Sequence, residues 1–259
     1  MIHTLARYQF RNIARSRWVF GAAVFFLVFS EALYQASGTA LRMQVSMMSV
    51  VLIVLPLFGI MYGAMHVYGS REFLEVLVAQ PLRRRDIFLS SYLVVTCTVA
   101  GCFIIGAGIP VLLHSTAESW ISGLLLLLAG ALLTAIFAAI AFVIAFRVHD
   151  RTRGIGLALL VWFAFSLLYD GVVLFAFHAL RDYPVEPIAI AASVLNPVDL
   201  ARIVLTLQYD VSALLGYTGA VYEKFFGSAL GAVMSIIALL LWIFAPLGVA
   251  ERIFARKDF

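Results

Sequence analysis

Six long apolar runs, separated by shorter polar segments, dominate the chain. They cover residues 18–36, 45–68, 88–113, 120–146, 154–178 and 228–250. About 20 apolar residues are needed for a helix to cross the hydrocarbon core of a bilayer. Only helices or closed barrels satisfy their backbone polar groups in lipid. The pattern therefore predicts an all-α integral membrane protein whose six transmembrane helices form a single transmembrane domain over residues 1–259.

The composition supports this class. Charged residues make up 12% of the 259 residues and apolar residues 64%, whereas a soluble domain has about 25% charged residues. So few charges cannot cover a water-facing surface, which excludes a soluble globular protein. The net charge of +4 is too small and too dispersed to indicate a nucleic-acid partner.

Lysine and arginine are distributed unevenly between the two sides of the predicted membrane. One side holds 14 of these residues, in the two terminal segments and in the second and fourth loops, and the other side holds 4. The positive-inside rule places the richer side in the cytoplasm. Both termini are therefore predicted to be cytoplasmic, in agreement with the even number of spans.

The segment before the first span has the pattern of an interfacial helix. Within residues 1–17, Arg7, Arg11 and Arg15 recur at every fourth position, opposite a row of apolar residues. Such a helix lies on a membrane surface with its arginines toward the lipid phosphates. A simple topology anchor is the alternative.

The longest loop, residues 179–227, lies on the predicted outer side. Three prolines punctuate it, and residues 188–195 and 199–207 are apolar enough to form short helices. Asn196 is the expected N-cap of the second helix, with Pro197 at its first position. The segment is either an external platform or a packed loop.

The polar insert at 69–87 is the most distinctive part of the chain, and we expect it on the cytoplasmic side. Its pattern predicts a short helix that ends before Pro81. The helix has an apolar stripe on one side and charged residues next to that stripe. The stripe consists of Phe73, Leu74, Leu77 and Val78, with Glu72 and Glu75 beside it; Arg84 and Asp86 follow the proline. A helix with one apolar and one charged side suits the groove of a soluble partner. A membrane-surface loop is the alternative.

This insert resembles the coupling loop of ABC-2-type permeases. The matching residues are Glu72, Leu74, Glu75, Leu77, Pro81, Arg84, Asp86 and Ile87. The resemblance implies a type V exporter-like permease fold in a bacterial inner membrane and assigns coupling to a separate ATPase to the residues of the insert. ATP and magnesium would be bound by that cytoplasmic ATPase, and this chain would bind no cofactor.

Residues 195–204 and 214–219 resemble a narrower group of these permeases, which serve copper-site maturation of nitrous oxide reductase in denitrification. This resemblance implies a homodimer of the permease, two copies of the ATPase and a periplasmic solenoid protein on the outer loops. The residues assigned to that external contact are Asn196, Pro197, Asp199 and Arg202.

Two acidic residues, Glu31 and Asp170, interrupt apolar runs. A charge in the bilayer costs about 2.5–3.5 kcal/mol on insertion scales, so both should face protein or water. Met43 and Met47 share a helical face, and thioethers suit Cu(I), but ordinary apolar packing is the expected role and no metal site is predicted.

Two other classes of function remain as alternatives at this point. An intramembrane protease or lipid-modifying enzyme needs converging catalytic groups, and neither His-Glu-x-x-His nor Gly-x-Ser-x-Gly occurs. A passive channel or scaffold needs no ATPase. The chain lacks a phosphate-binding loop of its own, so the favoured prediction is a non-catalytic permease subunit.

Overall fold

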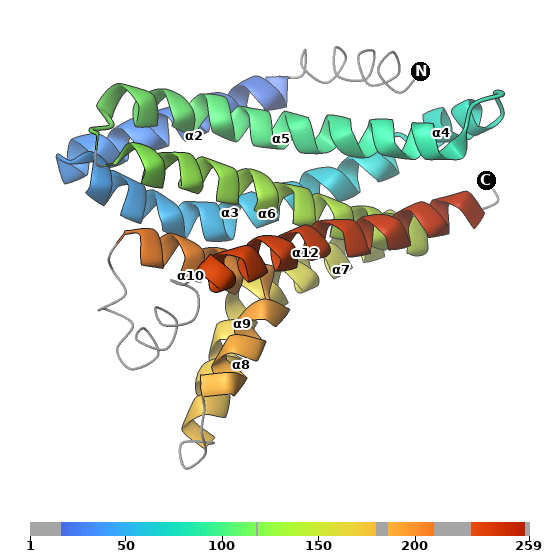
Figure 1. The fold of residues 1–259 in the computed structure, drawn as a ribbon. Coiled ribbons are helices and arrows are strands. Elements are labelled where there is room, and N and C mark those ends of the chain that lie inside the picture. Colours follow the sequence, from blue (N-terminus) through green and yellow to red (C-terminus); the bar gives the residue numbers. More distant parts are fainter. Residues whose placement is uncertain (1–16, 118, 180–185, 210–228, 257–259) are drawn as a thin grey trace.

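The computed structural model describes residues 17–117, 119–179, 186–209 and 229–256, and these residues form helices joined by short turns. Figure 1 shows the helices as one elongated bundle from which a helical pair projects. The helices are α2 (Arg17–Ser37), α3 (Ala40–Gly69), α4 (Arg71–Val78), α5 (Arg84–His114), α6 (Trp120–Arg147), α7 (Arg151–Phe163), the π-helix η1 (Ala164–Leu168), α8 (Tyr169–Ala179), α9 (Glu186–Leu195), α10 (Pro197–Gln208) and α12 (Ala229–Arg256).

The predicted all-α class and the six spans are confirmed. Within the described residues, the segments long and apolar enough to cross a membrane are Trp18–Ser37, Ala40–Gly69, Arg84–His114, Trp120–Arg147, Arg151–Ala176 and Val233–Arg256. α3 and α5 begin four or five residues before the apolar runs predicted at 45 and 88. The reason is that a helix continues past the hydrocarbon core, where side chains no longer need to be apolar.

α6 forms the centre of the bundle, in contact with α3, α5, α7, α10 and α12, while α2 lies against α5. Small residues allow α3 and α6 to approach closely. A Cβ atom on Gly59 would lie 2.9 Å from the backbone oxygen of Thr134, and one on Gly63 would lie 2.8 Å from the Cβ of Ala141. Close backbone contact between small residues is a usual way for membrane helices to associate.

The fifth span differs from the continuous helix predicted at 154–178. It consists of α7, the π-helix η1 and α8 in succession, and in Figure 1 α8 turns away from the bundle and projects beside α9. A π-helix leaves the regular hydrogen-bond pattern of an α-helix and often marks a functional site. The bend therefore coincides with a local change of helix type.

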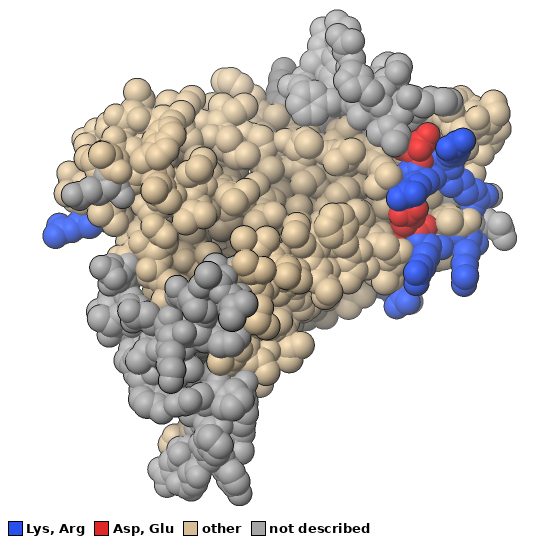
Figure 2. Space-filling model, in the orientation of Figure 1, with Lys and Arg blue, Asp and Glu red and all other residues tan. Residues whose placement is uncertain are grey.

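The charged side chains gather at one end of the bundle, as Figure 2 shows. This end contains α4, the start of α5, the turn between α6 and α7, and the end of α12; we call it the α4 end. Its orientation toward the cytoplasm stays a prediction from the distribution of arginine and lysine. The predicted interfacial helix with Arg7, Arg11 and Arg15 lies outside the described residues.

Candidate coupling site

The helix α4 is anchored to the bundle by its apolar side. Leu74 and Leu77 are buried and Val78 is half-buried. α4 ends at Val78, and the backbone N–H of Ala79 donates to the oxygen of Glu75, so the helix stops before Pro81 as predicted. Leu74 and Leu77 hold α4 in place and cannot be direct contacts for a partner in this arrangement.

The opposite side of α4 is open. Glu72 and Glu75 are exposed, and Val76 and Phe73 expose 59% and 41% of their surface. Within the described part of the chain neither glutamate has an ion-pair or hydrogen-bond partner on a side chain. Phe73 shares the face of Leu77, one helical turn away, as the predicted stripe has it, but it lies at the edge of that stripe and is partly exposed. The open side of α4 joins two carboxylates to two apolar side chains.

The first residue of α4 forms a dense set of hydrogen bonds with the end of α6. The guanidinium of Arg71 donates to the backbone oxygens of His149 at 2.6 Å, Val148 at 3.0 Å and Ala145 at 3.2 Å. The last carbonyls of a helix lack partners within it, and a cation is favourable at that end of the helix dipole. The prediction from the sequence left Arg71 out of the coupling residues.

Tyr68 completes this contact from the last turn of α3. Its hydroxyl donates to the oxygen of Val148 at 2.9 Å, and the guanidinium carbon of Arg71 lies 4.8 Å from the centre of its ring. Gly154 in α7 packs directly against the ring, since a Cβ there would lie 1.7 Å from the hydroxyl oxygen. We call Tyr68, Arg71 and Gly154, with the α6–α7 turn, the α4 clamp.

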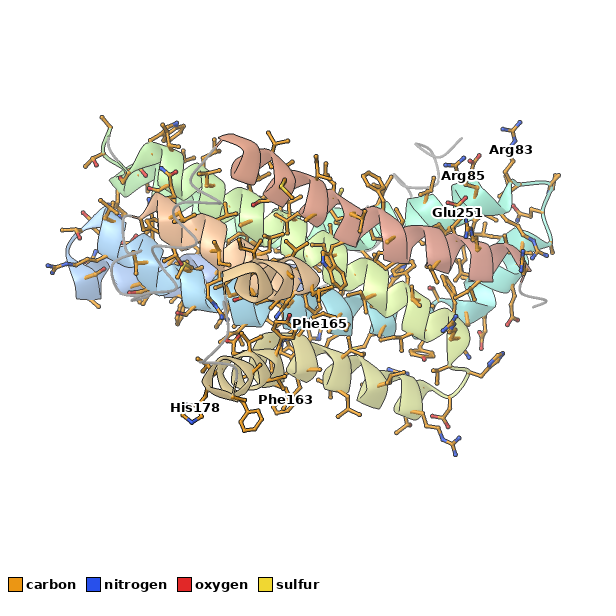
Figure 3. All side chains as sticks on the ribbon, turned by 60° about the horizontal axis from the view of Figure 1, so that its bottom comes forward. Arg83, Arg85, Phe163, Phe165, His178 and Glu251 are labelled. Carbon is orange, nitrogen blue, oxygen red and sulfur yellow. The ribbon has the colours of Figure 1, made fainter. Side chains whose placement is uncertain are left out.

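The start of α5 is tied to the last helix. Arg84 donates to the oxygen of Ala255 at 3.0 Å, and Arg85 forms an ion pair with Glu251 at 3.2 Å. Figure 3 shows Arg85 beside Glu251, with Arg83 farther out at the same end. Asp86 lies in the first turn of α5, where a carboxylate is favourable for the helix dipole. Arg84 and Arg85 therefore bind the start of α5 to α12.

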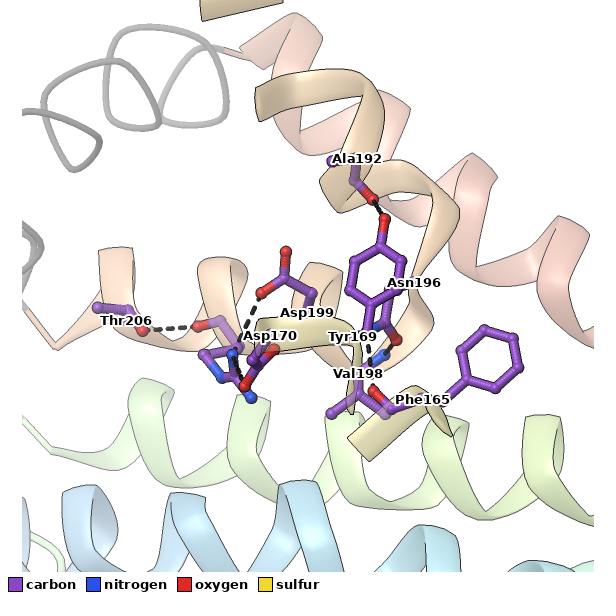
Figure 4. Close-up of polar contacts among 9 residues, drawn as sticks. Phe165, Tyr169, Asp170, Ala192, Asn196, Val198, Asp199 and Thr206 are labelled. Atoms are coloured by element: carbon purple, nitrogen blue, oxygen red, sulfur yellow. Dashed lines mark hydrogen bonds and ion pairs between the residues drawn. The ribbon is translucent and has the colours of Figure 1, made fainter. Parts of the chain in front are cut away.

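A second polar group lies between α8 and α10, shown in Figure 4. Arg202 contacts two carboxylates, Asp170 at 2.8 Å and Asp199 at 3.3 Å. Burial raises the pKa of Asp199, and the nearby guanidinium of Arg202 only partly opposes this effect. Asp170, predicted as an intramembrane acid, thus has a charged protein partner.

The π-helix is joined to α10 by Asn196. Its side-chain oxygen accepts from the N–H of Val198 at 3.0 Å, and its amide donates to the oxygen of Phe165 at 2.9 Å. Asn196 is therefore the N-cap of α10, with Pro197 at the first helical position, as predicted. Asn196 is fully buried, so it stabilises the joint between elements. The external contact assigned to this segment stays a prediction.

The other predicted polar positions lie elsewhere. Glu31 accepts from Gln35 at 2.9 Å and contacts His114 at 3.0 Å, at the end of the bundle opposite α4. Met43 and Met47 are fully buried in the apolar core. No group of three His, Cys, Asp or Glu residues able to hold a metal ion occurs in the described ranges.

Comparison with known proteins gives the family. The model of the ABC-2 family transporter proteins matches residues 3–259. The chain belongs to the ABC-2 family. Two curated relatives, from Pseudomonas aeruginosa and from Stutzerimonas stutzeri, are each 26% identical over 99% of this chain and 98% of the relative. Both bear the name "Probable ABC transporter permease protein NosY".

Membership of the ABC-2 family makes this chain the permease subunit of an ABC transporter in a bacterial inner membrane. Permeases of this family are not catalytic and work with a separate ATPase subunit. The enzyme alternative is thereby excluded. The sequence prediction missed Arg71, Tyr68 and Gly154. The position of Arg71 directly after a span was a signal for that residue.

Proposed function

We propose that this permease converts ATP-driven motion of a separate ATPase into work on the opposite side of the membrane, and that α4 is the element on which the ATPase acts. The observation that carries the proposal is the two-sided character of α4. Its buried leucines and Arg71 attach it to the bundle, while Glu72, Phe73, Glu75 and Val76 remain open. A partner that grips the open face therefore moves the bundle as well.

The wider assignment rests on similarity to the NosY permeases over almost the full length. We infer that the work serves copper-site assembly of nitrous oxide reductase, either as transport or as a mechanical signal to a periplasmic solenoid protein. The predicted complex contains two permeases and two ATPases. The charged network of Asp170, Asp199 and Arg202 lies at the base of the segment that would meet the periplasmic protein.

The test of the proposal is co-purification with the ABC ATPase subunit of the same transporter. We expect the double variant Glu72→Ala/Glu75→Ala to lose most of the bound ATPase, because it removes both exposed carboxylates of α4 without touching Leu74, Leu77 or Arg71. Membrane insertion and thermal stability should remain. Arg42→Gln is the control, since it removes an exposed charge near the start of α3, at the other end of the bundle.

The result that contradicts the proposal is full ATPase recovery with the double variant. Restored nitrous oxide reduction in cells that carry this variant, at the wild-type level, would speak against it equally. A separate experiment measures ion or solute flux through the purified permease without the ATPase. Substantial flux through the permease alone would favour a passive channel.

A further inference from the structure

Besides its packing against α3 and α5, α4 has a polar link to the bundle at the α6–α7 turn. Arg71 donates to three backbone oxygens of that region, at distances of 2.6–3.2 Å. An arginine is permanently charged and carries five N–H donors in a rigid planar fork, so it can hold several carbonyls at once. By contrast, the chain between α4 and α5, residues 79–83, is not part of a helix.

Tyr68 strengthens the same connection from the side of α3. Its hydroxyl donates to the oxygen of Val148, which Arg71 also contacts, and its ring lies under the guanidinium at 4.8 Å. The ring is packed against Gly154 in the first turn of α7. A displacement of Arg71 therefore presses on the turn and on α7 together.

The turn that joins α6 to α7 is short. α6 ends at Arg147 and α7 begins at Arg151, and Asp150 caps α7 by accepting from the N–H of Arg153 at 2.8 Å. The segment is thus fixed at both ends by hydrogen bonds. Movement of the α6–α7 turn must tilt or shift the start of α7.

α7 leads to the π-helix and to the second polar group. The oxygen of Phe165 in η1 accepts from Asn196, and the hydroxyl of Tyr169 donates to the oxygen of Ala192 at 2.6 Å. Asp170 contacts Arg202. Three contacts therefore connect η1 and α8 to the segment that includes α9 and α10.

We propose that Arg71 is the positioning residue through which α4 moves the α6–α7 turn, and that α7, η1 and α8 carry this movement to α9 and α10. The inference rests on the proposed function, because it needs an ATPase that acts on α4. It adds a specific route and a residue that a simple docking role does not require.

The test measures the distance between two spin labels in the purified permease–ATPase complex in lipid nanodiscs. The labels are attached at Arg42→Cys, near the start of α3, and at His178→Cys in the last turn of α8 (Figure 3). Cys97 and Cys102 are first replaced by alanine. We expect a change in this distance when a non-hydrolysable ATP analogue is added to the complex with wild-type Arg71.

The decisive variant is Arg71→Gln, which removes the charge and most donors. We expect the ATPase to remain bound and the basal rate of ATP hydrolysis to stay within about twofold, while the nucleotide-dependent distance change falls by more than half. Arg71→Lys, which keeps the charge but lacks the planar fork, should recover part of the change. Arg151→Gln is the matched control, since it removes an exposed arginine from the first turn of α7 and should keep the full change.

Other results have distinct meanings. A full distance change in Arg71→Gln overturns the inference and leaves the proposed function intact. The same conclusion follows if the wild-type complex binds the ATPase but shows no distance change on addition of the ATP analogue. Failure of the wild-type chain to bind the ATPase refutes the proposed function itself. If Arg71→Gln does not fold, Arg71→Met replaces it, because methionine keeps a long side chain but has no N–H donor, and a full change there also overturns the inference.

Discussion

The helix α4 and the polar group between α8 and α10 use charged residues in opposite ways. In α4, Arg71 is satisfied by backbone oxygens, and the carboxylates of Glu72 and Glu75 remain free of side-chain partners within the described residues. Between α8 and α10, Arg202 contacts both nearby carboxylates, and Asn196 is fully buried. One region keeps charges available, whereas the other pairs them internally.

This difference separates a surface for a partner from a joint within the chain. Exposed carboxylates next to exposed apolar side chains can gain contacts when a partner binds. Paired charges in a partly buried network instead hold two elements in a defined geometry, and the loss of one member leaves the others unsatisfied. Stability changes should therefore be small on the open face of α4 and larger in the clamp and in the joint.

The largest stability effect is expected at the clamp, from Gly154→Ala. The added Cβ would lie 1.7 Å from the hydroxyl oxygen of Tyr68 and 2.5 Å from the ring carbon that bears it, so the tyrosine must move away from Val148. Overpacking of this kind costs up to about 3 kcal/mol, which should appear as a lower midpoint of thermal unfolding in detergent.

Gly156→Ala is the control for this prediction, because a Cβ there meets nothing within 4 Å and alanine favours a helix over glycine by up to about 1 kcal/mol. An equal response of the two variants would show that the tight contact with Tyr68 does not matter.

An intermediate effect is expected at the joint, from Asn196→Ala. This change removes the N-cap of α10 and the donor to the oxygen of Phe165, at a cost of about 1–2 kcal/mol. Asn196→Ser keeps a cap oxygen but is too short to reach the π-helix, so it should recover only part of the loss in a thermal-unfolding assay.

The exposed neighbour Leu195 provides the comparison for that assay, since Leu195→Ala changes a side chain that is 64% exposed. Unfolding of Asn196→Ala at the wild-type temperature would argue against a structural joint.

The smallest effect concerns the pH dependence of Asp199. Burial raises the pKa of this carboxyl in the folded state, so the folded protein holds the proton more tightly than the unfolded chain does. Ionisation therefore costs stability as the pH rises from the unfolded pKa through the raised one. Asp199→Asn removes this cost. The unfolding midpoint of Asp199→Asn minus that of wild type should therefore be larger at pH 7 than at pH 3.

Gln208, a neutral and exposed residue at the other end of α10, serves as the reference, because Gln208→Ala should show the same offset from wild type at both pH values. A constant offset for Asp199→Asn as well would mean that the contact with Arg202 outweighs burial.

Periodicity and local chemistry allowed much of this molecule to be predicted. The spans follow from runs of about 20 apolar residues, the end of α4 follows from Pro81, and the cap of α10 follows from Asn196 and Pro197. Each of these features depends on residues that are close together in the sequence.

The sequence by itself therefore determined the membrane class, the six helices and the position of α4, because hydrophobic runs and helix signals act locally. Only the tertiary structure decided which side of α4 is open, that Arg71 reaches Val148 and His149 about 77 positions away, and that Arg202 joins Asp170 to α10. These contacts depend on how whole helices pack against one another. A pattern within one helix shows that a face is apolar, but the neighbouring helices determine what that face meets.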